Sequence, residues 1–138
     1  TKGNMALWGT FGYELDPNEL TDEEKEIVKA QIKEYHETYD LIRNGDLYRL
    51  ICPWDNEYRV AWEIVSEDKN EVLFTNVTMR YYRMWKYIVK LRGLDPEKIY
   101  TDLESGKSYS GAFLMNVGLN LTDYPRGNLA SFKIHLKA

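Results

Sequence analysis

Residues 21–44 constrain the fold most, because they have the features of one long amphipathic helix. Thr21 and Glu24 form a capping-box pattern, in which each side chain bonds the other's backbone N–H. Aromatic and aliphatic residues then recur at steps of four and three, on one arc roughly 80° wide. They are Val28, Ile32, Tyr35, Tyr39 and Ile42. Asn44-Gly45 closes the pattern with residues typical of a helix end. The predicted helix is roughly 35 Å long, about the span of a small domain.

From Asp46 onward the pattern changes to a period of two, which is typical of strands. In residues 58–64, Tyr58, Val60, Trp62 and Ile64 alternate with Arg59, Ala61 and Glu63, so the first set is predicted to form the buried face. Further strands are expected within 47–52, 72–79, 88–91, 99–101, 113–115 and 130–136. Six to eight short strands separated by turns predict an antiparallel β-sandwich, so the fold class is mainly β with one long helix in front.

Residues 5–8 are a short apolar run between Asn4 and Gly9, and are expected to form a strand buried on both faces. Strand, glycine loop and long helix make one βα unit, which has no sheet of its own to join. Residues 1–45 are therefore expected to be the end of a larger α/β assembly, or else to pack against the β domain of residues 46–138. The chain opens at Thr1 without a Met, so we expect a piece of a longer protein.

The composition of the chain limits the kinds of partner that it is expected to bind. The net charge is −4 with both signs interspersed, and no block of Lys and Arg offers phosphate contacts, so nucleic acid is not an expected partner. No run of about 18 apolar residues predicts a membrane span. Cys52 is the single cysteine, which favours a reducing, cytoplasmic location. His36 and His135 lie on different elements, so we predict no metal site and no cofactor.

Several phrases, taken together and in order, resemble the carboxyl end of bacterial α-galactosidases of glycoside hydrolase family 36. They are Phe-Gly-Tyr-Glu-Leu-Asp at 11–16, the helix end and strand at 40–50, Ala-Trp-Glu-Ile-Val-Ser at 61–66, Gly-Leu-Asp-Pro at 93–96 and Leu-Met-Asn-Val-Gly-Leu at 114–119. One departure is residues 81–87, which are aromatic and basic where this family is usually rich in proline.

The resemblance implies a large enzyme with a central (β/α)₈ barrel that hydrolyses terminal α-galactosides, such as melibiose and raffinose, with retention. Residues 1–45 would hold the last strand and helix of that barrel, and residues 46–138 the C-terminal antiparallel β-sandwich. The two catalytic aspartates of the family lie on earlier barrel strands, outside this chain. The implied partners are the rest of the barrel and the α-galactoside that the parent enzyme binds.

No residue of the chain itself is predicted to be catalytic, substrate-binding or metal-binding. Retaining glycosidases need two carboxylates about 5 Å apart. The acids here are expected on a solvated helix face or in turns. Those singled out are Glu23, Glu24, Glu26 and Asp40 on the helix, and Asp16, Asp55 and Asp95 in turns. Trp8, at the end of the expected strand, is predicted to be either a core residue or a contact to a sugar ring.

Three functional hypotheses follow. The first is a structural accessory domain of an α-galactosidase, inactive in isolation. The second is a carbohydrate-binding β-sandwich that stacks sugars on the aromatic cluster Tyr81, Tyr82, Trp85 and Tyr87, residues that burial could explain equally well. The third is a homo-oligomerisation module that uses Tyr35 and Tyr39.

Overall fold

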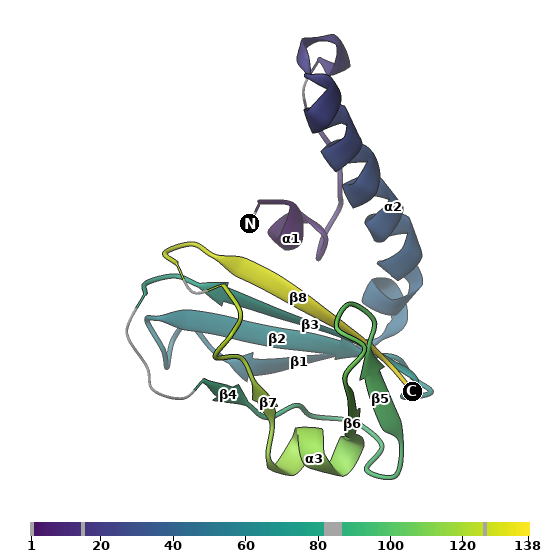
Figure 1. Ribbon diagram of the computed structural model, residues 1–138, viewed down its shortest axis with the longest axis vertical. Coiled ribbons are helices and arrows are strands. Elements are labelled where there is room, and N and C mark those ends of the chain that lie inside the picture. The colour runs from purple at the N-terminus through teal and green to yellow at the C-terminus, as the bar shows by residue number, and fades with distance from the viewer. Residues whose placement is uncertain (1, 15, 82–86, 126) are drawn as a thin grey trace.

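The computed structural model describes residues 2–14, 16–81, 87–125 and 127–138. A curved antiparallel sheet forms its centre (Figure 1). One long helix and a short N-terminal helix lie on one side of this sheet, and a two-stranded sheet with another short helix lies on the other. The molecule therefore has a large sheet whose two faces are covered by different elements.

Helix α2 (Asp22–Asn44) confirms the predicted long helix, and its ends have the predicted chemistry. The hydroxyl of Thr21 accepts from the backbone N–H of Glu24 at 3.3 Å. The carboxylate of Glu24 in turn accepts from the backbone N–H of Thr21 at 2.9 Å, which completes the capping box. At the other end the Gly45 N–H donates to the Leu41 carbonyl oxygen at 2.9 Å.

The large sheet has six strands in the order β1-β2-β3-β8-β5-β6, and every adjacent pair is antiparallel. Its strands are β1 (Asp46–Ile51), β2 (Arg59–Val65), β3 (Glu71–Thr78), β5 (Ile99–Asp102), β6 (Ser108–Ser110) and β8 (Ser131–Lys137). Strands β4 (Ile88–Val89) and β7 (Leu119–Asn120) pair separately. The predicted meander over the first three strands and the predicted strands near 99–101 and 130–136 are confirmed.

The prediction of which face of β2 meets the core is wrong. Ala61, Glu63 and Val65 point into the main core between the large sheet and the β4–β7 layer. The other face, with Trp62 and Ile64, points toward α1 and α2. Both faces of β2 are covered, so alternation alone could not identify the inner one.

The strand predicted at residues 5–8 is also wrong, because this segment begins with helix α1 (Lys2–Ala6) and continues as a turn. Met and Ala are good helix formers, and the segment contains no β-branched residue to favour a strand. Leu7 is fully buried on the outer face of the large sheet, against Leu41, Ile64 and Leu73. The side-chain amide of Asn4 donates to the Ser131 hydroxyl at 2.9 Å. The segment thus docks on the sheet instead of joining it as a strand.

The strand predicted at 113–115 is helix α3 (Gly111–Asn116). Ser110 caps this helix, since its hydroxyl accepts from the Phe113 backbone N–H at 3.1 Å. Leu114 is buried in the core, while Phe113 stacks on Tyr109 at 5.9 Å between ring centroids. None of the helices in the described ranges has the length and apolar character needed to cross a bilayer.

Candidate functional site: the exposed face of α2 and the groove beside it

The apolar arc of α2 is only partly covered, since Tyr35 and Ile42 pack against the buried cluster that contains Leu41, Ile64 and Leu73. The most buried residues of α2 are Thr38 and Leu41, at 2% and 7% exposure, and Glu34 one turn earlier bonds Lys133 of β8. Ile32 and Tyr39, from the apolar arc, are 39% and 38% exposed. At about 100° per residue the covered stripe is rotated by roughly 100° from the centre of the apolar arc. The outer part of the apolar arc, with Ile32 and Tyr39, is therefore available for a contact other than the sheet.

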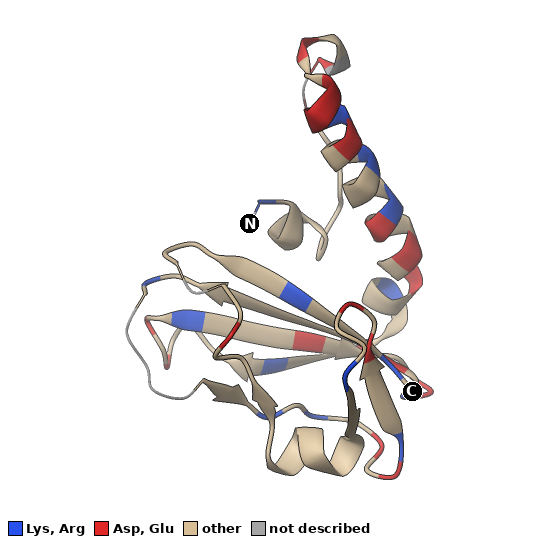
Figure 2. Cartoon of the chain, viewed as in Figure 1, with Lys and Arg blue, Asp and Glu red and all other residues tan. Residues whose placement is uncertain are grey.

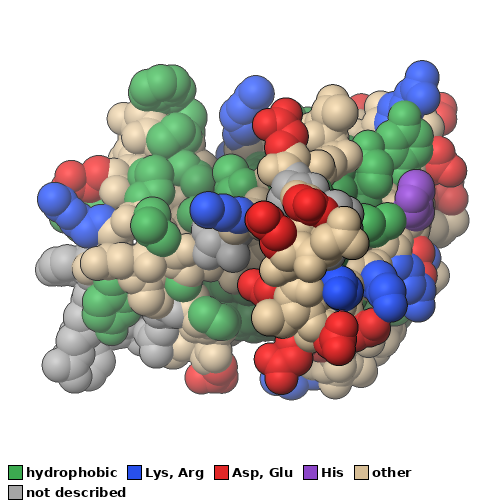
Figure 3. Space-filling model, turned by 90° about the horizontal axis from the view of Figure 1, so that it is seen from above, with side chains coloured by type: hydrophobic (Ala, Val, Ile, Leu, Met, Phe, Trp, Pro, Cys, Tyr) green, Lys and Arg blue, Asp and Glu red, His purple; other side chains and the backbone are tan. Residues whose placement is uncertain are grey.

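Aromatic side chains form a continuous row along this available face. Phe11 stacks on Tyr35 with ring centroids 5.2 Å apart, and Tyr13 meets Phe11 edge-on at 5.4 Å. Tyr35 meets Tyr39 at 5.5 Å, and the guanidinium carbon of Arg43 lies 5.9 Å from the Tyr39 ring. In Figure 1 the N-terminal half of this helix extends well beyond the sheet. Figure 3, which views the molecule from above, shows several groups of hydrophobic side chains at the surface between charged ones.

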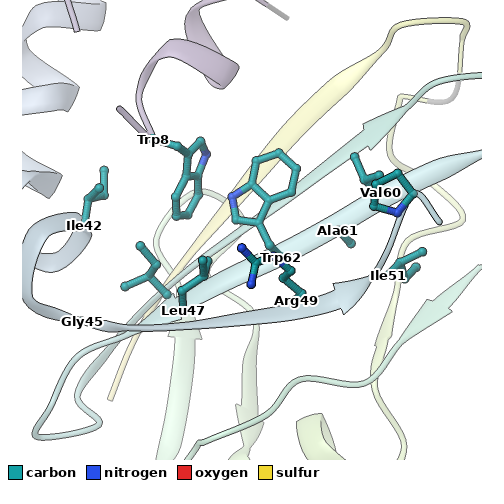
Figure 4. Close-up of a pocket in the computed structure, with 11 residues that line it drawn as sticks. Trp8, Ile42, Gly45, Leu47, Arg49, Ile51, Val60, Ala61 and Trp62 are labelled. Carbon is teal, nitrogen blue, oxygen red and sulfur yellow. The ribbon is translucent and has the colours of Figure 1, made fainter. Parts of the chain in front are cut away.

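A groove lies between the C-terminal end of α2 and the outer face of β1 and β2 (Figure 4). Its cavity volume is about 430 Å³. Its lining residues are mostly apolar and come from both sides of Gly45: Trp8, Ile42, Gly45, Leu47, Arg49, Ile51, Pro53, Val60, Ala61, Trp62 and Ile64. The rings of Trp8 and Trp62 meet edge-on at 5.5 Å across it. Trp8 is half-buried here, so it belongs neither to the main core nor to open surface.

Among the described residues that line the groove, Arg49 is the one with a charged side chain. It pairs with Trp62 across the β1–β2 ladder and therefore lies on the same face as that indole. Within the described part of the chain, the Arg49 side chain makes no hydrogen bond or ion pair. Arg49 was not singled out in the sequence, because one Arg in a half-exposed strand carries no distinguishing signal.

The acids singled out in the sequence lie in turns and along α2, where several act as caps or form surface ion pairs. Asp16 caps a 3₁₀ turn, η1 (Pro17–Glu19), by accepting from the Asn18 backbone N–H at 2.9 Å. Asp95 does the same for the Glu97 N–H at 3.0 Å in a turn after β4. Glu24 belongs to the capping box and Glu26 pairs with Lys29 along α2. Among the described residues, no group of three or more His, Cys, Asp or Glu is arranged to hold a metal ion.

Glu63 is an acid that sequence reasoning placed on the wrong face. Its side chain is 0% exposed, and its Oε1 accepts from the Arg92 backbone N–H at 2.6 Å. Its Oε2 is buried and has no hydrogen-bond partner among the described residues. Burial raises the pKa of Glu63 to about 8, against the opposing effects of the Arg92 N–H and the Arg92 charge. A protonated carboxyl group could act as a general acid, but this one lies within the core and meets no substrate.

The aromatic cluster proposed as a sugar platform is described only at its two ends, since residues 82–86 lie outside the described ranges. Tyr81 is half exposed. Tyr87 is buried, its hydroxyl donates to the side-chain oxygen of Asn76, and the guanidinium carbon of Arg59 lies 3.6 Å from its ring centroid. Tyr87 is therefore committed to the core and offers no face to a sugar.

Comparison with known protein families assigns the two parts of the chain separately. The family model described as the glycosyl hydrolase family 36 C-terminal domain matches residues 59–136, which is more than half of the chain. The chain belongs to glycosyl hydrolase family 36. A second family model, Melibiase, matches residues 1–45. The two matches lie on either side of β1 and together cover α1, α2 and most of the sheet.

The similar proteins of family 36 are α-galactosidases. The chain is 42% identical over 125 residues to the bifunctional alpha-galactosidase/sucrose kinase AgaSK of Mediterraneibacter gnavus, covering 90% of this chain and 13% of that protein. It is 37% identical over 139 residues to alpha-galactosidase Mel36A of Lactobacillus acidophilus, covering 100% and 19%. The crystal structure of the family 36 alpha-galactosidase AgaB from Geobacillus stearothermophilus matches with a TM-score of 0.91 and 35% identity, covering 99% and 19%. The chain thus spans less than a fifth of the length of these relatives.

Proposed function

We propose that the chain is the C-terminal part of an α-galactosidase, in which it has a structural, accessory role. The parent enzyme would hydrolyse terminal α-galactosyl residues of oligosaccharides. The observation that carries this proposal is the order of the two family matches, Melibiase at residues 1–45 followed by the C-terminal domain at 59–136. A variant of the related AgaA from Geobacillus stearothermophilus was solved in complex with raffinose, which supports oligosaccharides of this kind as substrates.

The proposal places the boundary between the two parts at Gly45. Residues 1–45 would belong to the (β/α)₈ barrel, with α2 as its last helix, and residues 46–138 would form the accessory domain. The exposed apolar face of α2 supports this division, since a helix of a barrel needs an apolar face toward neighbouring barrel elements.

We further propose that residues 1–138 supply no catalytic carboxylate. The scattered positions of the turn and helix acids and the burial of Glu63 support this. A cytoplasmic location is part of the same proposal, and the single Cys52, which forms no disulfide within the chain, is compatible with it.

A chimeric enzyme tests the proposed role. The C-terminal residues of Geobacillus AgaB that correspond to this chain are replaced by residues 1–138, and hydrolysis of a chromogenic α-galactoside is measured. We expect an active enzyme whose KM and preference among melibiose and raffinose match those of AgaB, because the reacting groups lie in the retained part. An inactive chimera, or an active one with a new substrate preference, would contradict the proposal.

A further inference from the structure

Two hydrogen-bond donors face the groove between α2 and β1, and neither has an acceptor in the described part of the chain. The indole Nε1 of Trp8 is buried without a hydrogen-bond partner. The guanidinium group of Arg49 has no hydrogen bond or ion pair within the described residues. Figure 4 shows both side chains at the groove, with Arg49 beside Trp62.

This arrangement calls for an acceptor from outside the described chain. A buried N–H without a partner is unfavourable, and the guanidinium group of Arg49, which is exposed in this chain, can pair with an opposite charge. A carboxylate suits Arg49 best, since its two oxygens match the planar guanidinium group. It also has enough lone pairs to accept from a further donor. The remaining lining, with Leu47, Trp62 and Ile64, favours apolar neighbours around that carboxylate.

We infer that the groove seats a segment of the enzyme's own (β/α)₈ barrel that presents apolar side chains and one carboxylate to Arg49. This inference rests on the proposed function and adds the surface and its chemistry. The groove lies across the boundary between the two matched parts. Trp8 and Ile42 lie in the part that matches Melibiase, and Trp62 lies in the part that matches the C-terminal domain. The relatives carry more than four-fifths of their length outside this match, so such a segment is available in each of them.

The groove and the exposed arc of α2 form one continuous contact face. Ile42 lines the groove and also ends the predicted apolar arc, and together with Tyr39 and Arg43 it lines a second hollow beside the groove. A partner seated in the groove would thus also cover the aromatic row. Arg49 then acts as the charged anchor that fixes the register of an otherwise apolar contact.

The test uses the AgaB chimera with Arg49→Glu, which places a like charge against the expected carboxylate. We expect the half-life of hydrolytic activity at elevated temperature to fall about tenfold or more, with kcat and KM unchanged at low temperature. Trp8→Phe keeps a ring but removes the N–H, and should shorten the half-life less. Lys107→Glu, an exposed charge reversal on the β5–β6 hairpin, is the matched control and should behave as the unmodified chimera.

Arg49→Glu is also measured in the 138-residue chain alone, where the urea midpoint should not change because the Arg49 side chain has no partner among the described residues. If the unmodified chimera is active but Arg49→Glu and Lys107→Glu have the same half-life, the inference is wrong and the proposed function stands. If the unmodified chimera is inactive, the proposed function itself fails. If the chain alone sediments as a dimer that Arg49→Glu dissociates, a second copy fills the groove and the inference is overturned.

Discussion

Replacing Glu63 by Gln should stabilise the fold relative to the wild-type chain, by an amount that grows as the pH rises. Gln has the shape of a protonated Glu and can accept the same hydrogen bond from the Arg92 backbone N–H, but it cannot ionise. In the wild-type chain the buried carboxyl group holds its proton to about pH 8, whereas in the unfolded chain it loses that proton near its ordinary value of 4.5. The variant removes this difference.

The direction in which the free energy of unfolding changes with pH depends on which state, folded or unfolded, binds the proton more tightly. Below about pH 4.5 both states are protonated, so Glu63 contributes its full stability there. As the pH rises, the unfolded state releases the proton first, so the wild-type chain loses stability until the folded state also ionises near pH 8. At 1.36 kcal/mol per unit, the loss is about 5 kcal/mol over the whole range, with about 3 kcal/mol already lost by pH 7.

Urea unfolding followed by tryptophan fluorescence measures the effect. The difference in free energy of unfolding between Glu63→Gln and wild type should grow by about 3 kcal/mol between pH 5 and pH 8. Glu67→Gln, at an exposed position in the turn after β2, is the matched control and should follow the wild-type pH dependence. A difference that does not change with pH would show that Glu63 titrates normally and that its burial has been misjudged.

Two further predictions concern α2 and its junction with the sheet. Thr21→Ala removes the capping box and should destabilise the first turns of the helix by about 1 kcal/mol, seen as faster amide exchange there, while exchange near Leu41 stays unchanged. Gly45→Ala should lower the free energy of unfolding by about 1–3 kcal/mol, because its Cβ would lie 2.4 Å from the Ile64 side chain. Gly12→Ala, whose Cβ meets nothing within 4 Å, is the control, and equal urea midpoints for the two alanine variants would contradict this account of the junction.

The elements that the sequence predicts correctly have either a clear local signal or a long periodic pattern. The capping box at Thr21 and Glu24 correctly located the start of α2, and alternation correctly located β8, where Phe132, Ile134 and Leu136 are buried. Both cases rest on interactions within a few residues or on one continuous periodic face.

Short apolar runs are harder to assign to helix or strand from the sequence, because either element can bury a few residues. Residues 113–115 form a helix, and the capping serine at position 110 was the signal that could have identified it. Near the N-terminus, residues 5–8 were predicted as a strand from their apolar character alone. That prediction failed because a strand needs a neighbour in a sheet, and Leu7 finds its burial against the face of the sheet instead.

The sequence of a single helix or strand does not show which of its faces packs against the core when both faces are covered. The apolar arc of α2 was predicted, but the stripe that meets the sheet is the one with Thr38 and Leu41. In β2 the charged Glu63 faces the core while Trp62 faces the groove. Both choices depend on which partner covers each side, and that information lies in distant parts of the chain. The groove itself, with Arg49 and Trp8, combines residues more than forty positions apart and had no sequence signal.

The central claim is that residues 1–138 provide support for an α-galactosidase and none of its reacting groups. The most direct measurement is the rate at which the purified 138-residue chain releases product from a chromogenic α-galactoside. We expect no release above the uncatalysed background at any pH between 4 and 8. Hydrolysis by the chain alone that is abolished when one of its own acids, such as Glu63 or Asp95, is replaced by its amide would contradict the claim.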